Sequence, residues 1–232
     1  YVHVSDRLAQ MIGLKLIAEG RLAEMAGPAL LNLDIYMRTM NLKRAAESLY
    51  GNVSAENRRL LERYSDGVNA YLDQHKDKLP PGLALSGYKP EPWKPMDSIT
   101  ICVLLSFGLS FNLPEEIAAL NIAQAVGAEK TAWLLPIYPD EPIPLGEAAE
   151  LRGVDLKKAA ESVAGIDELQ PFLSSLGLSG AAASNNWAVR GEKTKNGASI
   201  FCSDMHLPLS MPSMWNMIHL RCGAYDVAGM SV

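Results

Sequence analysis

The chain has 232 residues, of which 48% are hydrophobic and 20% are charged, a mixture typical of globular proteins that excludes wholesale disorder. Its 21 basic and 26 acidic residues give a net charge of −5. No basic run is present, so neither nucleic acid nor a membrane is expected as a partner. The longest apolar run, residues 98–114, is interrupted by serine, glycine and asparagine and predicts a core helix rather than a membrane span.

The first three-quarters of the sequence predicts helices. Apolar residues at helical spacing predict one helix from Ser5 or Asp6 to Gly27, a second over residues 30–51, and a third after a serine cap at Ser54. The prolines of residues 79–95 predict a segment without regular helix. Further helices are predicted at residues 98–109, 114–127, 155–164 and 168–176.

From about residue 178 the pattern changes to short strands, predicted at residues 187–190, 199–202, 213–221 and 225–230. The Asn-Gly pair at 196–197 predicts a hairpin turn. Helices followed by antiparallel strands predict an α+β fold. The three cysteines lack CxxC spacing and predict no disulfide scaffold, Cys102 is expected in the core, and a Cys202–Cys222 pair stays open.

A stretch of small residues leads directly into the sequence SNNW at residues 184–187. If the bond between Ala183 and Ser184 is broken, Ser184 gains a free α-amine beside its own hydroxyl. Such an amine has a pKa of about 7.7–8.0 and can serve as the base that activates the hydroxyl. The pattern therefore suggests an N-terminal nucleophile. The alternative is a linker that enters a strand, with Ser184 filling a turn.

The sequences SNNW at 184–187 and SDMHL at 203–207 resemble the start of the β chain of the penicillin acylase (penicillin amidase) family of N-terminal nucleophile hydrolases. That family also includes cephalosporin and acyl-homoserine lactone acylases. Ser184 and His206 are 22 residues apart, as in the family. The sequences YVHVSDRL at 1–8, GYKPEPW at 87–93 and YDVAG at 225–229 resemble further family segments in the same order, so the resemblance covers the whole chain.

The resemblance implies an αββα sandwich, in which residues 1–168 form a helical α-chain region, 169–183 a spacer and 184–232 the start of the β chain. It implies that the precursor cuts itself between Ala183 and Ser184. Ser184 then attacks the amide of a small-molecule acyl-amide substrate, and water hydrolyses the acyl-enzyme. Penicillin, cephalosporin, lactone and peptide substrates all stay open.

The resemblance also assigns further roles. His206 borders the nucleophile and helps to bind the oxyanion and the amide, and Leu207 lines the acyl pocket; strand hydrogen bonding and core packing are the alternatives. No catalytic cofactor is expected. Glu116 matches the α-chain ligand of a structural calcium ion in the full-length parent, or simply favours the helix dipole. Ser203 and Met205 replace the asparagine and proline of the family pattern, which puts the local network around Ser184 in question.

The resemblance further suggests that both ends of the chain are trimmed, that the remainder of the β chain is its partner, and that the fragment alone is inactive. A periplasmic or secreted location is expected. The alternative is a non-catalytic or unprocessed scaffold or binding protein of the same fold. A competing zinc site is suggested by alternating side chains on one predicted strand, with one more on the next: Cys202, Asp204, His206 and His219.

Overall fold

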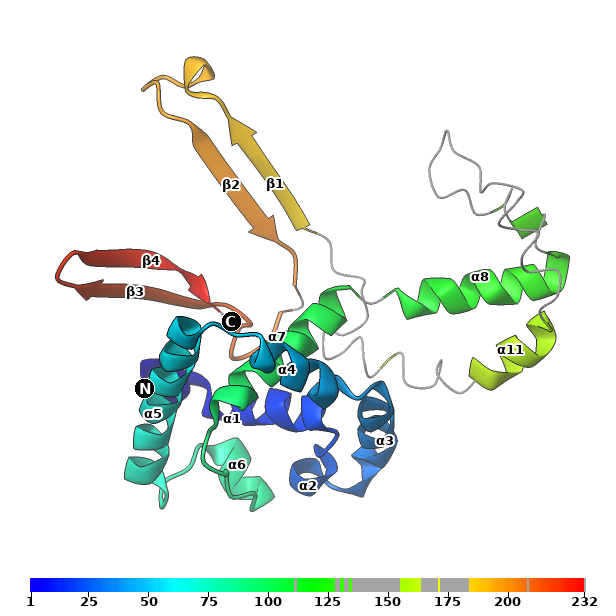
Figure 1. Cartoon of the computed structure of the whole chain (residues 1–232), viewed down its shortest axis with the longest axis horizontal. Coiled ribbons are helices and arrows are strands. Elements are labelled where there is room, and N and C mark those ends of the chain that lie inside the picture. The colour runs from blue at the N-terminus through cyan, green and yellow to red at the C-terminus, as the bar shows by residue number, and fades with distance from the viewer. Residues whose placement is uncertain are drawn as a thin grey trace. The chain divides into compact units, whose positions relative to one another are not determined.

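The computed structural model describes residues 1–110, 112–127, 130–131, 134, 155–163, 171, 184–207 and 209–231 (Figure 1). The chain forms two compact units, one of Tyr1–Phe107 with Ala182–Val232 and one of Gly108–Ala181. Helices followed by antiparallel strands confirm the predicted α+β class. The first unit therefore combines the helices at the start of the sequence with the strands at its end. The predicted spacer 169–183 and the predicted helix 168–176 lie outside the described residues, apart from residue 171, which both ranges include.

Two left-handed residues divide the helices predicted at the start of the chain. Gly20, with φ 62°, ends the first helix early, and Asn41, with φ 54°, divides the second. Glycine and asparagine adopt this conformation readily, but the hydrophobic pattern does not register it. The single helices predicted from Ser5 or Asp6 to Gly27 and over 30–51 were therefore wrong in extent. The observed elements are α1 (Val2–Glu19), α2 (Ala23–Ala26), η1 (Pro28–Leu30), α3 (Leu31–Met40) and α4 (Leu42–Gly51).

Helix α5 (Ala55–His75) begins as predicted, because the hydroxyl of Ser54 accepts a hydrogen bond from the backbone N–H of Asn57 at 3.2 Å. The proline-rich segment contains one short helix, α6 (Pro81–Ser86), against the prediction of none. Proline is tolerated in the first helical turn because its missing N–H would have no partner there. The same reason lets α7 (Pro95–Leu109) begin at a proline.

The apolar stretch Pro95–Val126 has the length and mean hydropathy of a membrane span, and 24% of its most apolar window is buried. It consists of two helices, α7 with 15 residues and α8 (Leu113–Val126) with 14. Each is shorter than the roughly 20 residues that cross a bilayer. Helix α7 confirms the predicted helix, but Cys102 on it is exposed, so its expected core position was wrong. In the second unit, α8 contacts α11 (Leu156–Val163).

The core of the first unit is built around α1, whose apolar side chains repeat every four residues and are almost fully buried: Val4, Leu8, Ile12 and Leu16. Further buried side chains come from the other helices: Met37, Val68, Leu83 and Leu104. Lys15 and Asp97 form an ion pair inside this core, with 2.8 Å between Nζ and Oδ2. The pair joins α1 to the first turn of α7.

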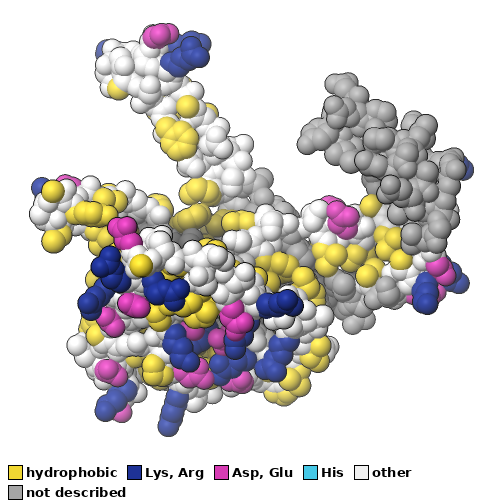
Figure 2. Space-filling view, in the orientation of Figure 1, with side chains coloured by type: hydrophobic (Ala, Val, Ile, Leu, Met, Phe, Trp, Pro, Cys, Tyr) yellow, Lys and Arg dark blue, Asp and Glu magenta, His cyan; other side chains and the backbone are white. Residues whose placement is uncertain are grey.

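The strands form two separate antiparallel hairpins. Strand β1 (Ser184–Val189) pairs with β2 (Ile200–Met205), and β3 (Asn216–Cys222) pairs with β4 (Tyr225–Ser231). The hairpin predicted at 196–197 is confirmed, with the short helix η4 (Gly191–Lys193) in its connection, although β1 begins three residues earlier than predicted. Figure 2 shows hydrophobic side chains on the visible face of both hairpins. Cys202 and Cys222 are free thiols on different hairpins.

Candidate functional site

Ser184 is the first residue of β1, and its position is set by the register of the hairpin. Its Cα lies opposite that of Met205, while Asn185 and Asn186 lie opposite Asp204 and Ser203. The two segments that carried the family resemblance are therefore cross-strand neighbours, and residues directly opposite in an antiparallel pair have side chains on one face. Ser184 is exposed. Its role as a nucleophile stays a prediction, and Ala183 lies outside the described residues.

His206 follows the last residue of β2, one position beyond the partner of Ser184. Its Nε2 lies 2.7 Å from Oδ2 of Asp204, and the side chains of His206 and Asp204 are 45% and 65% exposed. A carboxylate bonded to one ring nitrogen orients the imidazole and sets its tautomer. No hydrogen bond joins His206 to Ser184 among the described residues, so the hairpin brings the two residues near each other without joining them.

The remaining predicted site residues surround this strand end. The Ser203 hydroxyl lies 3.5 Å from Sδ of Met205 and donates to it, so these two departures from the family pattern bond to each other. Leu207 is half-buried beyond His206. The roles assigned to His206 and Leu207 stay predictions.

Glu116 stands in the first turn of α8, where its Oε1 accepts a hydrogen bond from Nδ2 of Asn112 at 3.0 Å. Within the part of the chain that the structure describes, no three histidine, cysteine or acidic side chains are grouped to hold a metal. These residues therefore do not make up a calcium site, and a role of Glu116 toward calcium stays a prediction. The zinc hypothesis loses its basis for the same reason, since His219 lies on the other hairpin and bonds Asp226 instead.

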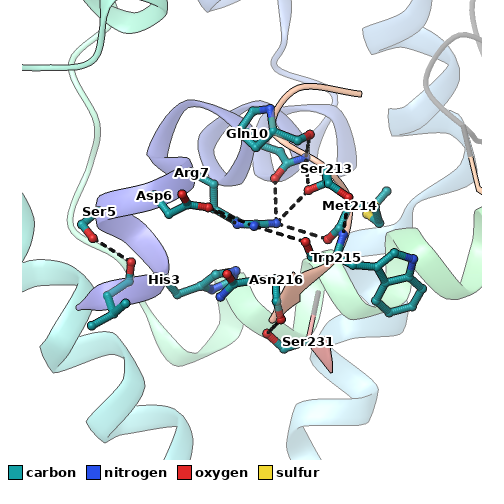
Figure 3. A network of polar contacts seen from close by, with 12 residues as sticks. His3, Ser5, Asp6, Arg7, Gln10, Ser213, Met214, Trp215, Asn216 and Ser231 are labelled. Carbon is teal, nitrogen blue, oxygen red and sulfur yellow. Dashed lines mark hydrogen bonds and ion pairs between the residues drawn. The ribbon is translucent and has the colours of Figure 1, made fainter. Parts of the chain in front are cut away.

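A buried arginine that sequence analysis did not single out joins α1 to the backbone that precedes β3 (Figure 3). Nη1 of Arg7 donates to the carbonyl oxygens of Ser213 at 2.8 Å and Met214 at 3.2 Å, and Nη2 lies 3.5 Å from that of Trp215. The side chain is 6% exposed and pairs with Asp6 at 3.0 Å. Its signal in the sequence was an arginine between apolar residues on the buried face of a predicted helix.

Gln10, one turn after Arg7, supports the same contact. Its Nε2 donates to the carbonyl oxygens of Pro212 at 3.2 Å and Ser213 at 3.4 Å, and its Oε1 accepts from Nη1 of Arg7 at 3.4 Å. Together the two side chains donate five hydrogen bonds from α1 to four consecutive carbonyls. We call this set of contacts the Arg7 clamp.

An apolar cavity of about 510 Å³ lies beside the clamp, between helices α1, α5 and α7 and the hairpin of β3 and β4. At its polar edge Nδ1 of His3 lies 2.6 Å from the hydroxyl of Tyr64. Burial, followed by the charge of Arg7, lowers the pKa of His3, and burial raises the pKa of Tyr64 to about 12. Neither Ser184 nor His206 lines this cavity.

The whole length of the chain, residues 1–232, matches the penicillin amidase family, and the chain belongs to that family. The recognised resemblance is thereby confirmed. Over all of its length the chain is 51% identical to the acyl-homoserine lactone acylase QuiP of Pseudomonas aeruginosa and 47% identical to QuiP of Pseudomonas syringae pv. syringae. It is 31% identical to the penicillin acylase 2 proenzyme of Pseudomonas sp. strain SE83. The chain spans only 27%, 28% and 30% of the length of these three relatives.

Proposed function

We propose that this chain is part of an N-terminal nucleophile acylase that cuts itself between Ala183 and Ser184 and then hydrolyses an acyl amide. The observation that carries the proposal is the register of the first hairpin, in which Ser184 begins β1 opposite Met205, the residue that precedes His206. The family membership and the acylase names of the relatives support it. The αββα sandwich and a periplasmic or secreted location belong to the same proposal.

Cleavage begins when the hydroxyl oxygen of Ser184 attacks the carbonyl carbon of Ala183. The C–N bond breaks, the acyl group moves to the oxygen as an ester, and the nitrogen takes the hydroxyl proton to become an amine. Water then hydrolyses the ester, which leaves a carboxylate on Ala183 and a free hydroxyl on Ser184. The exposed position of Ser184 gives this water access to the ester.

In turnover the α-amine of Ser184 accepts the proton of its own hydroxyl while the oxygen attacks the substrate amide. The proton passes to the leaving amine, and the acyl group stays on Ser184 as an ester. Water hydrolyses that ester to a carboxylic acid and restores the hydroxyl. His206, oriented by Asp204, would contribute a hydrogen bond to the polar centre, and half-buried Leu207 would contact the acyl group.

We favour N-acyl-homoserine lactones as substrates, with a carboxylic acid and homoserine lactone as products. The acyl-homoserine lactone acylases are up to 51% identical to this chain, against 31% for the penicillin acylase 2 proenzyme. A penicillin side-chain acylase is the second candidate. A scaffold of the same fold, with its chain unbroken, is the non-catalytic alternative.

The decisive experiment uses the protein at the full length of its relatives and combines intact-mass analysis with an assay of acyl-homoserine lactone hydrolysis. We expect two polypeptides, one of which begins at Ser184, and release of the carboxylic acid. Ser184→Ala is expected to leave one polypeptide and to lower turnover by at least about 10⁴-fold, because the attacking group is absent. Ser199→Ala, an exposed serine between β1 and β2, is the matched control and should process and turn over normally.

Two results would contradict the proposal. One is an unbroken wild-type chain that hydrolyses the substrate, and the other is a Ser184→Ala variant with normal activity. Hydrolysis of penicillin with no hydrolysis of any acyl-homoserine lactone would instead select the second substrate class. An unbroken wild-type chain that hydrolyses neither substrate would favour the scaffold.

A further inference from the structure

We propose that Arg7 is a positioning residue for the nucleophile, acting through the segment between β2 and β3, and that it bridges the two polypeptides once the chain is cut. The inference rests on the proposed function for the location of the cut and of the nucleophile. The contact itself is a feature of the structure. Arg7 belongs to α1, whereas the carbonyls that it binds lie more than 200 residues later (Figure 3).

The segment that Arg7 holds begins at the candidate site. It starts with His206 and Leu207, directly after the β2 residue that lies opposite Ser184, and it ends at the carbonyls of Ser213 and Met214. One end of the segment is thus tied to the nucleophile strand by the β1–β2 register, and the other end is tied to α1 by the clamp. A shift at the clamp end would move His206 relative to Ser184.

Burial makes this contact hard to replace. A guanidinium stays charged at all accessible pH values, and a buried cation needs hydrogen-bond acceptors. Arg7 is 6% exposed, while its carboxylate partner Asp6 is 56% exposed and can bond to water instead. The carbonyls of the segment are therefore the acceptors that Arg7 needs most. Its planar group serves several of them at once, whereas a lysine ammonium is a single point donor.

Cleavage changes the Arg7 clamp from a contact within one polypeptide into a contact between two. Before cleavage at Ala183–Ser184, Arg7 and the carbonyls belong to one polypeptide; after it, they belong to two. Contacts within one chain act at high effective concentration, but contacts between separate chains must hold the pieces together on their own. Helix α1 makes five hydrogen bonds to this segment within the described residues, and all come from Arg7 or Gln10. Loss of the clamp should thus cost the cut protein more than the uncut precursor.

The test uses the protein at the full length of its relatives, with Arg7→Gln and Arg7→Lys. We expect the kcat for acyl-homoserine lactone hydrolysis to fall about 10–100-fold in both, because small displacements of reacting groups cost this much, while KM stays within about twofold. The matched control is Arg58→Gln. Arg58 also donates to a backbone carbonyl, that of Tyr50 at 3.0 Å, but both residues lie in the helical region. We expect the control to keep kcat.

A second pair of measurements separates positioning from simple stability. Urea should separate the two polypeptides of cut Arg7→Gln at a lower concentration than in the wild type, and the difference should shrink in the uncut Ser184→Ala background. Guanidinium ions at low millimolar concentration should restore part of the kcat of Arg7→Ala. If Arg7 variants fail to fold, Gln10→Ala removes only two of the five donated bonds and should lower kcat by a smaller factor.

The inference is overturned if folded Arg7→Gln keeps the wild-type kcat, or if it loses as much stability in the uncut background as in the cut protein. Where the Arg7 variants fail to fold and Gln10→Ala is tested instead, a normal kcat in Gln10→Ala also overturns the inference. Failure of the proposed function looks different, because wild-type protein would then be uncut or Ser184→Ala would be active, whatever the Arg7 variants do.

Discussion

The helices of residues 1–107 and the hairpins of residues 184–231 differ in how far their apolar side chains are buried. On α1, Leu8 and Leu16 are at most 1% exposed. On the hairpins, Phe201 and Met217 are 71% and 79% exposed, although both belong to regular, fully paired strands. The strands of each hairpin pair with each other, but apolar side chains are well buried only in the helical region.

The difference follows from the geometry of the two kinds of element. A helix satisfies its own backbone and buries one stripe against helices that are near in sequence. A two-stranded hairpin satisfies only half of its edges and covers neither face, so it is marginal without further layers. We infer that residues 1–107 carry most of the stability of this unit, and that the hairpins depend on what packs over them. The following predictions test this contrast, from the largest expected effect to the smallest.

Lys15→Met should cost about 3–5 kcal/mol of unfolding free energy, because it leaves Asp97 charged and unpaired in the core. Asp226→Asn makes the comparable change on the second hairpin, where Asp226 bonds His219. It should cost less than about 1 kcal/mol, since both side chains are more than half exposed. Urea unfolding followed by circular dichroism measures both values. Equal costs for the two variants would remove the contrast between the regions.

Leu16→Ala should cost about 2–5 kcal/mol, because it opens a cavity in the best-packed part of the core. Leu220→Ala makes the same chemical change on β3, where the side chain is 55% exposed, and should cost less than about 1 kcal/mol. The same unfolding measurement applies. A large cost at Leu220 would show that the hairpin is packed in solution.

Ser54→Ala should cost about 1 kcal/mol, because the first turn of α5 loses the side chain that accepts from Asn57. Ser54→Gly should cost only about 0.3 kcal/mol, since water reaches the freed N–H more easily. Hydrogen exchange of the α5 amides gives the measurement. An effect on the hairpin amides instead would mean that the two regions unfold together.

The smallest effect concerns pH. Burial and the charge of Arg7 lower the pKa of His3 in the folded chain below its ordinary value of 6.5. Protonation therefore favours the unfolded chain, and the contribution of His3 to stability is complete above pH 6.5 and is lost as pH falls toward the folded pKa. The urea concentration at the unfolding midpoint should decrease as the pH is lowered from about 7.5 to 5.5, and this decrease should be smaller in His3→Gln. An unchanged slope in that variant would assign the pH dependence to other groups.

Particular residues show which features of the fold the sequence predicted and which it did not. The cap at Ser54 and the turn at 196–197 are local signals, so the start of α5 and the first hairpin followed from them. Gly20 and Asn41 were missed as helix ends, because the apolar spacing continues past them. The SNNW and SDMHL segments identified the family before any geometry was known, and the register of β1 and β2 then placed them side by side.

The sequence by itself determined the α+β class, the hairpin with its turn at 196–197 and the family, since each depends on residues close together in the chain or on a pattern of motifs. Only the tertiary structure decided that Arg7 binds carbonyls of residues 213–215, that Lys15 pairs with Asp97, and that Cys102 is exposed. These contacts join residues up to about 200 positions apart. Their partners are largely backbone atoms or side chains that carry no periodic signal, so no local pattern could indicate them.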